Sequence, residues 1–175
     1  MLFKEGYIIE HAISRYLPKP YPHVKTESKN MYYASLLTSD FAGTISEMSA
    51  VSMYTYQQII SSTPKISDTL SCISKVEMHH MEILGELISI LGGNPRIAVQ
   101  SGSNCIFWSA QYISYETNPK IFLKENISAE MATIANYKTR ISQITDPYIQ
   151  DILARIIMDE EYHIELFRAL LDELT

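Results

Sequence analysis

One repeat of polar residues constrains the fold of this chain more than any other feature of its sequence. Two stretches, 83 residues apart, carry large apolar side chains at alternating steps of four and three, the spacing of one helix face. In the first stretch, Glu77 and His80 interrupt the apolar pattern, and in the second, Glu160 and His163 do. Because residues three apart share a helix face, each Glu-x-x-His places a carboxylate beside an imidazole in the predicted core. The apolar positions are Ile66, Leu70, Ile73, Leu84, Leu87 and Leu91, and Ile149, Leu153, Ile156, Phe167, Leu170 and Leu174.

The same offset links a second set of residues. Glu47 is repeated as Glu130, and Tyr54 is repeated as Tyr137. In each half, the lone glutamate lies 30 residues before the glutamate of the Glu-x-x-His. The chain is therefore predicted to be a duplicated helical hairpin, with one lone glutamate, one Glu-x-x-His and one tyrosine in each half.

Proline and N-cap residues divide the chain into four predicted helices. Thr63, Asn118 and Asp146 are each followed by a proline, and such pairs are typical of helix starts because the N–H that proline lacks has no intrahelical partner there. A glycine pair ends the second helix. The predicted helices run from about Asn30 to Ser62, from Thr63–Pro64 to Gly92–Gly93, from Asn118–Pro119 to near Thr145, and from Asp146–Pro147 to the C-terminus.

The connections between these helices differ in length. Tight turns join the first helix to the second and the third to the fourth, whereas about 25 residues separate the second from the third. A connection of that length can span the bundle and place the third helix parallel to the second. The predicted fold class is all-α: a ferritin-like four-helix bundle made of two duplicated helical hairpins joined by a long crossover, over residues 31–175.

Residues 1–30 are predicted to form an extended N-terminal strap ahead of that bundle domain. They contain Pro18, Pro20 and Pro22, and closely spaced prolines resist helix formation because each lacks an N–H and restricts the residue before it. Glu5 and Glu10 interrupt the apolar stretch that a signal peptide would need.

Composition narrows the class of function. The chain has 175 residues, 46% of them hydrophobic, which suits one globular domain. A net charge of −6 and the lack of a basic cluster argue against a nucleic-acid partner. Two cysteines without a CxxC cannot build a zinc ribbon or a rubredoxin-type site. No apolar run reaches about 18 residues, so we expect no membrane span and a soluble, cytoplasmic protein.

The converging carboxylates indicate a metal site. A buried carboxylate without a partner costs several kcal/mol, and four in one core would also repel one another. Two divalent cations would neutralise four carboxylates, whereas a polar network without metal would be only half satisfied. Either Glu77 and Glu160 or Glu47 and Glu130 are expected to bridge the two ions. The predicted metal ligands are Glu47, Glu77, His80, Glu130, Glu160 and His163.

Two tyrosines and one histidine near the predicted ligands also need an interpretation. Tyr54 and Tyr137 lie seven residues after their glutamates, on nearly the same helix face, so they are candidate catalytic residues that hydrogen-bond the carboxylates or supply a proton or an electron. Ordinary core tyrosines are the alternative, since a buried tyrosine hydroxyl usually finds a partner. His79 is about 100° away from the seam and is predicted to lie at the edge of the bundle or in solvent, without binding metal.

The segments "VEMHHMEILGELISILGG" (76–93) and "EEYHIELFRALLDEL" (160–174) resemble the rubrerythrin and bacterioferritin branch of the ferritin-like di-metal proteins. The resemblance covers about residues 30–175 and implies metal-binding roles for the six predicted ligands, with Tyr54 and Tyr137 matching the paired tyrosines of rubrerythrins. Rubrerythrins usually carry an extra glutamate where this chain has Thr133, and their rubredoxin module is absent here. Met78 falls where bacterioferritins place a haem ligand, although a surface methionine is the simpler interpretation.

The resemblance implies an oxidoreductase with two Fe or two Mn ions per chain that reduces hydrogen peroxide or O₂ in oxidative-stress defence, with an external electron donor. A dimanganese catalase, which needs no donor, is one alternative. A ferroxidase or iron-storage protein is another, and a bundle with a purely structural metal pair is a third. A homo-oligomer is expected, with a dimer favoured. A dimer would agree with an enzyme, whereas a shell of 24 chains would indicate iron storage. Mixed carboxylate and imidazole ligands suit both metals, so the sequence does not choose between Fe and Mn.

Overall fold

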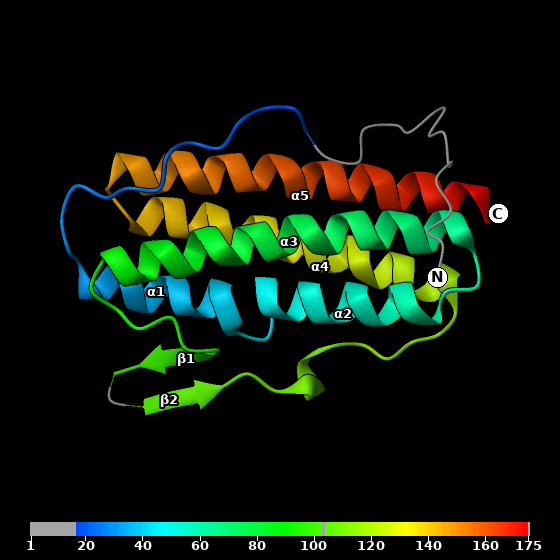
Figure 1. Ribbon diagram of the computed structural model, residues 1–175, viewed down its shortest axis with the longest axis horizontal. Helices are drawn as coiled ribbons and strands as arrows, with labels where there is room; N and C mark the ends of the chain where they lie inside the picture. Colours follow the sequence, from blue (N-terminus) through cyan, green and yellow to red (C-terminus); the bar gives the residue numbers. More distant parts are fainter. Residues whose placement is uncertain (1–16, 103, 175) are drawn as a thin grey trace, which may run out of the picture.

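The computed structural model describes residues 17–102 and 104–174, and its main body is a bundle of long helices (Figure 1). α1 and α2 follow one another along one leg of the bundle, and α3, α4 and α5 form the other three legs. The predicted all-α, ferritin-like four-helix bundle is confirmed. The helices are α1 (Met31–Ala42), α2 (Glu47–Ile60), α3 (Pro64–Ile90), α4 (Pro119–Gln143) and α5 (Pro147–Glu173). Within the described residues, no helix is both long and apolar enough to cross a membrane.

The helix starts follow the sequence signals. Proline occupies the first turn of α3, α4 and α5, as predicted. The side chains of Asn118 and Asp146 accept hydrogen bonds from backbone N–H groups of the first turn, whereas Thr63 makes no such side-chain bond. At the end of α3, Gly92 has a φ of 98°, a conformation that glycine adopts without a steric penalty.

The first leg of the bundle is broken. The prediction of one continuous helix from Asn30 to Ser62 is wrong at its centre, because residues 43–46 separate α1 from α2. The Ser46 hydroxyl donates to the Gly43 carbonyl at 2.7 Å and accepts from the Ser49 N–H at 3.3 Å, so Ser46 acts as the N-cap of a new helix. As a result, Glu47 is the first residue of α2.

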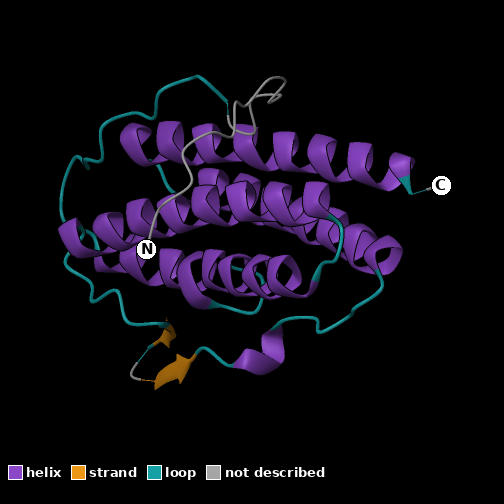
Figure 2. Cartoon of the chain, turned by 45° about the vertical axis from the view of Figure 1, so that its right-hand side comes forward, coloured by secondary structure: helices purple, strands orange, loops and turns teal. Residues whose placement is uncertain are grey.

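The crossover contains structure that the sequence analysis did not predict. β1 (Ala98–Ser101) and β2 (Asn104–Phe107) form an antiparallel hairpin, and a short 3₁₀ helix η1 (Ala110–Tyr112) follows. Figure 2 shows both outside the layer of helices. The Trp108 indole N–H donates to the Ser49 hydroxyl at 2.9 Å, which fixes the crossover to the start of α2.

Residues 17–30 run along the N-terminal half of α5 and then around the end of the bundle to α1, without forming a helix (Figure 1). Arg155 donates from Nε and Nη2 to the Lys19 carbonyl, at 3.0 and 2.8 Å. The Glu27 N–H donates to Asp146 at 2.7 Å. Residues 1–16 of the predicted strap lie outside the described residues, and the domain boundary at residue 30 stays a prediction.

Two apolar clusters fill the bundle on either side of a polar layer. One contains residues of α1, the C-terminal half of α3 and the N-terminal half of α5. The other contains residues of α2, the N-terminal half of α3 and the C-terminal half of α5. The predicted apolar positions on α3 and α5 are buried, except for Leu174, which is half-buried. The polar layer between the clusters holds the candidate site.

Candidate metal centre

The structure brings all six predicted ligands together in the middle of the bundle. Each side chain is at most 2% exposed, although four are carboxylates and two are imidazoles. They come from all four legs: Glu47 from α2, Glu77 and His80 from α3, Glu130 from α4, and Glu160 and His163 from α5.

The six side chains form two overlapping groups. In each group, four ligand atoms, one from each residue, lie within 4.8 Å of one another. Glu77 and Glu160 belong to both groups, whereas Glu47 and Glu130 belong to one each. Of the two bridging arrangements that the sequence left open, this geometry favours the one in which Glu77 and Glu160 are shared. The groups are Glu47, Glu77, His80 and Glu160, and Glu77, Glu130, Glu160 and His163.

The two imidazoles present the same atom to the carboxylates. His80 Nδ1 lies 3.1 Å from a Glu77 oxygen, 3.3 Å from a Glu160 oxygen and 3.5 Å from a Glu47 oxygen. His163 Nδ1 lies 2.9 Å from oxygens of both Glu77 and Glu160. Nδ1 is therefore the imidazole nitrogen that is placed to bind a metal in each half.

Burial and mutual charge shift the pKa of several groups in the layer. Burial raises the pKa of Glu77 well above its usual value, and the charges of Glu160 and Glu130 raise it further. Burial alone would lower the pKa of His80 and of His163, but the surrounding carboxylates raise both well above the usual value. Protonated imidazoles thus offset part of the carboxylate charge, which is the role that bound cations would take.

The donor set fits a pair of cations. One oxygen each of Glu47, Glu77 and Glu160 is fully buried and makes no hydrogen bond, although each lies within 3.5 Å of an imidazole Nδ1. Buried charged oxygens of this kind are costly unless a cation or a donor satisfies them. Carboxylate oxygens together with imidazole nitrogens suit Fe and Mn.

The two predicted tyrosines each reach across to the other half of the repeat. Tyr54 on α2 donates to Glu130 on α4 at 2.6 Å, and Tyr137 on α4 donates to Glu47 on α2. Burial and nearby carboxylate charges raise the pKa of both hydroxyls well above the usual value, so both remain protonated donors. The contacts match the predicted hydrogen bonding to carboxylates, while a catalytic role stays a prediction.

Among the described residues, Asp159 and Tyr21 lie outside the predicted set and contact His80, and Arg155 contacts Asp159. Asp159 accepts from His80 Nε2 at 3.1 Å and from the Tyr21 hydroxyl. Arg155 Nη1 lies 2.6 Å from the same carboxylate oxygen. Burial would raise the pKa of Asp159, but hydrogen bonds from His80, Arg155 and Tyr21 lower it to about 2. Asp159 could have been found from its place next to Glu160, whereas nothing in the strap sequence pointed to Tyr21.

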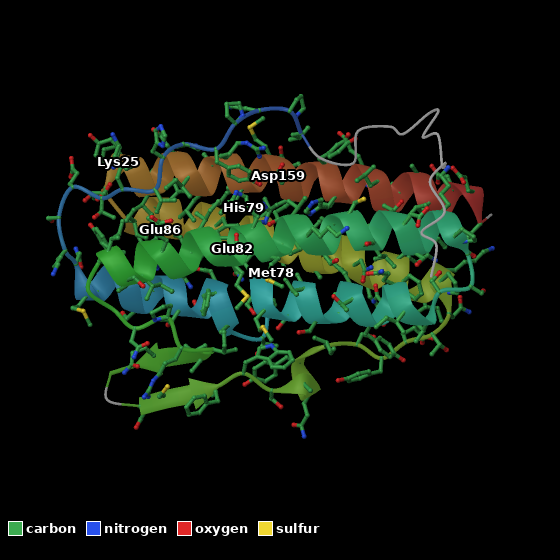
Figure 3. All side chains as sticks on the ribbon, viewed as in Figure 1. Lys25, Met78, His79, Glu82, Glu86 and Asp159 are labelled. Atoms are coloured by element: carbon green, nitrogen blue, oxygen red, sulfur yellow. The ribbon has the colours of Figure 1, made fainter. Side chains whose placement is uncertain are left out.

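His79 and Met78 lie away from the ligands. The His79 side chain is 49% exposed and its ring contacts that of Tyr21 edge-on, with centroids 4.8 Å apart. Figure 3 shows His79 and Asp159 on neighbouring helices, near the middle of the bundle. Met78 is exposed on α3, as an ordinary surface methionine is.

A small cavity opens between α2 and α4 beside the ligands. Its volume is about 210 Å³, and its lining includes Glu130, Tyr54 and Thr133. Tyr112 and Ile113 of the crossover contribute to the same lining. The cavity offers a small molecule a route to one carboxylate of the site.

Comparisons with known proteins found a matching family model and similar proteins. A family model described as Rubrerythrin matches residues 42–171. A probable manganese catalase of Clostridium acetobutylicum is 26% identical over 172 residues, and the alignment covers 86% of this chain and 75% of that protein.

Two solved structures share the fold. A manganese catalase from Anabaena superposes with a TM-score of 0.82 and 24% identity, over 95% of this chain and 81% of that one. The bacterioferritin BfrA of Mycobacterium tuberculosis superposes with a TM-score of 0.69 and 18% identity, over 84% of this chain and 88% of that one. At these identities, the likeness concerns the fold.

Proposed function

The chain belongs to the rubrerythrin family of ferritin-like di-metal carboxylate proteins, and on this premise we propose that it binds two manganese or iron ions and decomposes hydrogen peroxide. The observation that carries the proposal is the pair of four-residue ligand groups that share Glu77 and Glu160. In the proposal, Glu47 and His80 complete one metal position, and Glu130 and His163 complete the other.

Two such ions side by side would supply two-electron redox chemistry toward a small oxidant. In the proposal, the residues of the chain bind the ions, exclude bulk water and hold protons beside two of the carboxylates. The Tyr54 hydroxyl holds a proton at Glu130, and the Tyr137 hydroxyl holds one at Glu47. We propose that these two tyrosines are catalytic residues that return protons to the carboxylates during turnover.

The size of the cavity supports a small substrate. At about 210 Å³, the space next to Glu130 holds only a few molecules of the size of water or hydrogen peroxide. The walls combine apolar side chains such as Met53 and Ile113 with hydroxyl groups and the carboxylate of Glu130. Hydrogen peroxide and O₂ both fit this description.

Similarity to a probable manganese catalase along most of the chain supports a catalase-type reaction. In that reaction, two hydrogen peroxide molecules yield two water molecules and one O₂, so peroxide is both oxidant and reductant. No outside electron donor is needed. The expectation from the sequence, peroxide reduction with an external donor, is the second candidate, and the match to the rubrerythrin family model supports it.

One experiment separates these candidates. The protein is loaded anaerobically with Mn(II) or with Fe(II), hydrogen peroxide is added with and without a chemical reductant, and O₂ release and peroxide loss are followed. O₂ release without reductant identifies a catalase, whereas peroxide loss only with reductant identifies a peroxidase. A Glu77→Gln variant, which loses a shared carboxylate, should be inactive in either case, and a His79→Ala variant should match the wild type. Loaded wild type that consumes peroxide under neither condition would overturn the proposal.

Iron oxidation for storage stays open as an alternative activity. The match in fold to a bacterioferritin is consistent with it. We propose a homo-oligomer, with a dimer favoured, and the mass in solution distinguishes a small assembly from a shell of about 24 chains.

A further inference from the structure

The two halves of the centre have the same ligands but differ in the residues next to those ligands. On α5, Asp159 precedes the shared Glu160 and contacts His80 Nε2 at 3.1 Å. The position that repeats Asp159 in the other half is Val76, whose side chain has no hydrogen-bond acceptor. Cys72 occupies the position that repeats Arg155, and a thiol does not carry the positive charge of a guanidinium. The approximate two-fold repeat is therefore broken next to the metal ligands.

On the Asp159 side, three elements meet at one imidazole. Tyr21, from residues 17–30, donates its hydroxyl to Asp159 and lies 3.0 Å from His80 Nε2. Arg155 pairs with Asp159 at 2.6 Å, and its guanidinium lies over the Tyr21 ring, 4.2 Å from the centroid. Arg155 also donates to the Lys19 carbonyl. The segment of residues 17–30, α5 and the ligand on α3 are thus tied together.

This arrangement fixes the imidazole of His80 in the state that a metal requires. With an Nε2–H directed to Asp159, Nδ1 is the nitrogen that would lose its proton to an incoming ion, and its lone pair would then face Glu77 and Glu160. A carboxylate that accepts the second N–H of a ligand histidine sets its tautomer and orientation and increases its basicity. Val76 cannot do this for His163.

We propose that Asp159, Tyr21 and Arg155 make the two metal positions unequal, so that the position of Glu47 and His80 binds its ion more tightly and fills first. This inference rests on the proposed two-metal function and adds an order of loading to it. Asp159 and Tyr21 act as positioning residues, through His80 rather than on the substrate. The ion at the Glu130 and His163 position exchanges more readily.

Single-position variants test this directly. His163→Ala leaves the Glu47 and His80 position, and His80→Ala leaves the Glu130 and His163 position. Free Mn(II) is measured by its electron paramagnetic resonance signal during titration of each variant. We expect the His163→Ala variant to bind Mn(II) about 10-fold to 100-fold more tightly than the His80→Ala variant, which is the usual size of such outer contacts.

Further substitutions assign the difference to the outer residues. Adding Asp159→Asn or Tyr21→Phe should weaken Mn(II) binding in the His163→Ala background and leave it unchanged in the His80→Ala background. Val76→Asp should strengthen binding in the His80→Ala background, since it supplies the acceptor that the valine side chain lacks. This variant remains informative even if Asp159→Asn unfolds the protein, because unfolding can weaken Mn(II) binding but cannot strengthen it.

Equal Mn(II) affinity in the two single-position variants, or no gain from Val76→Asp, would overturn the inference while leaving the two-metal proposal in place. Wild-type protein that binds no Mn(II) or Fe(II) would overturn the two-metal proposal itself. Thermal unfolding of each variant, followed by circular dichroism, shows that the comparison is made between folded proteins.

Discussion

His79 and His80 are neighbours in the sequence, yet the structure gives them different surroundings. His80 is fully buried with Nδ1 among three carboxylates, whereas His79 is half exposed beside Glu82 and Tyr21. The 83-residue repeat already separates them, because His80 is repeated as His163 and His79 as Tyr162. A lone Glu-x-x-His would not have made this distinction.

A matched pair of variants tests the distinction. His80→Ala should lower the metal content by about one ion per chain, because it removes a nitrogen ligand from one position. His79→Ala should keep the wild-type metal content and change the melting temperature little, since its side chain is on the surface. Metal analysis by mass spectrometry after anaerobic loading gives both numbers. A loss of metal from His79→Ala equal to that from His80→Ala would contradict the assignment.

The tyrosines permit a second test at the same scale. Tyr54→Phe and Tyr137→Phe each remove one buried hydrogen bond to a carboxylate and should lower the free energy of unfolding by about 1 kcal/mol. Both variants should retain two metal ions, while the rate of peroxide turnover falls. Unchanged turnover in the double variant would leave the two tyrosines as ordinary core residues.

Protons and metal ions compete for Glu130, which gives a prediction for pH. Burial and then the charge of Glu160 raise the pKa of Glu130 to about 7, against hydrogen bonds from His163 and Tyr54 that lower it. When the pH is below this pKa, Glu130 is protonated, and an incoming ion must displace the proton. Mn(II) affinity should therefore fall by about tenfold or more for each pH unit below 7, because each displaced proton contributes one power of ten. Titrations at several pH values between 5.5 and 8 measure this, and affinity that does not change with pH would contradict it.

The contacts of Asp159 and Tyr21 with His80 show which site residues the sequence can predict and which it cannot. Asp159 could be inferred from its place beside Glu160 in the sequence, because a carboxylate there can reach the histidine of a neighbouring helix. Tyr21 could not, since its contact depends on how a segment without periodicity runs along α5. Residues on regular helices were predictable, and a residue on an irregular segment was not.

At the scale of elements, the break between α1 and α2 differs most from expectation. The sequence signals were present, since Gly43 follows the last turn of α1 and Ser46 precedes Glu47. An isolated glycine inside a helical pattern does not by itself end a helix, so these signals do not fix a break. The break places Glu47 in the first turn of α2, where the partial positive charge of a helix N-terminus favours a carboxylate.

Two glycine substitutions test the importance of that break. A Cβ on Gly43 would lie 2.5 Å from the Ser39 carbonyl oxygen, so Gly43→Ala should lower the free energy of unfolding by about 1–3 kcal/mol. Gly85 lies within α3, and a Cβ there would meet Phe41 at an ordinary 3.4 Å. Gly85→Ala should be neutral or stabilising by up to about 1 kcal/mol, because alanine favours helix over glycine. Denaturant unfolding compares the two, and equal stability of both variants would contradict this account of the break.

At the scale of the whole molecule, two helical hairpins each contribute one half of a single polar layer. The α2–α3 hairpin supplies Glu47, Glu77 and His80, and the α4–α5 hairpin supplies Glu130, Glu160 and His163. This organisation was predictable, because an internal repeat fixes which positions are equivalent. The β1–β2 hairpin in the crossover was not, since four-residue strands leave too short a pattern to distinguish from a loop.

The central claim is that one chain holds two metal ions through ligands from both halves, with Glu77 and Glu160 shared. Counting metal per chain by mass spectrometry, after anaerobic loading with Mn(II) or Fe(II), tests it most directly. The account predicts two ions in the wild type, about one in Glu47→Ala and in Glu130→Ala, and close to none in Glu77→Ala and in Glu160→Ala. Wild-type protein that holds well under two ions per chain with either metal would contradict it.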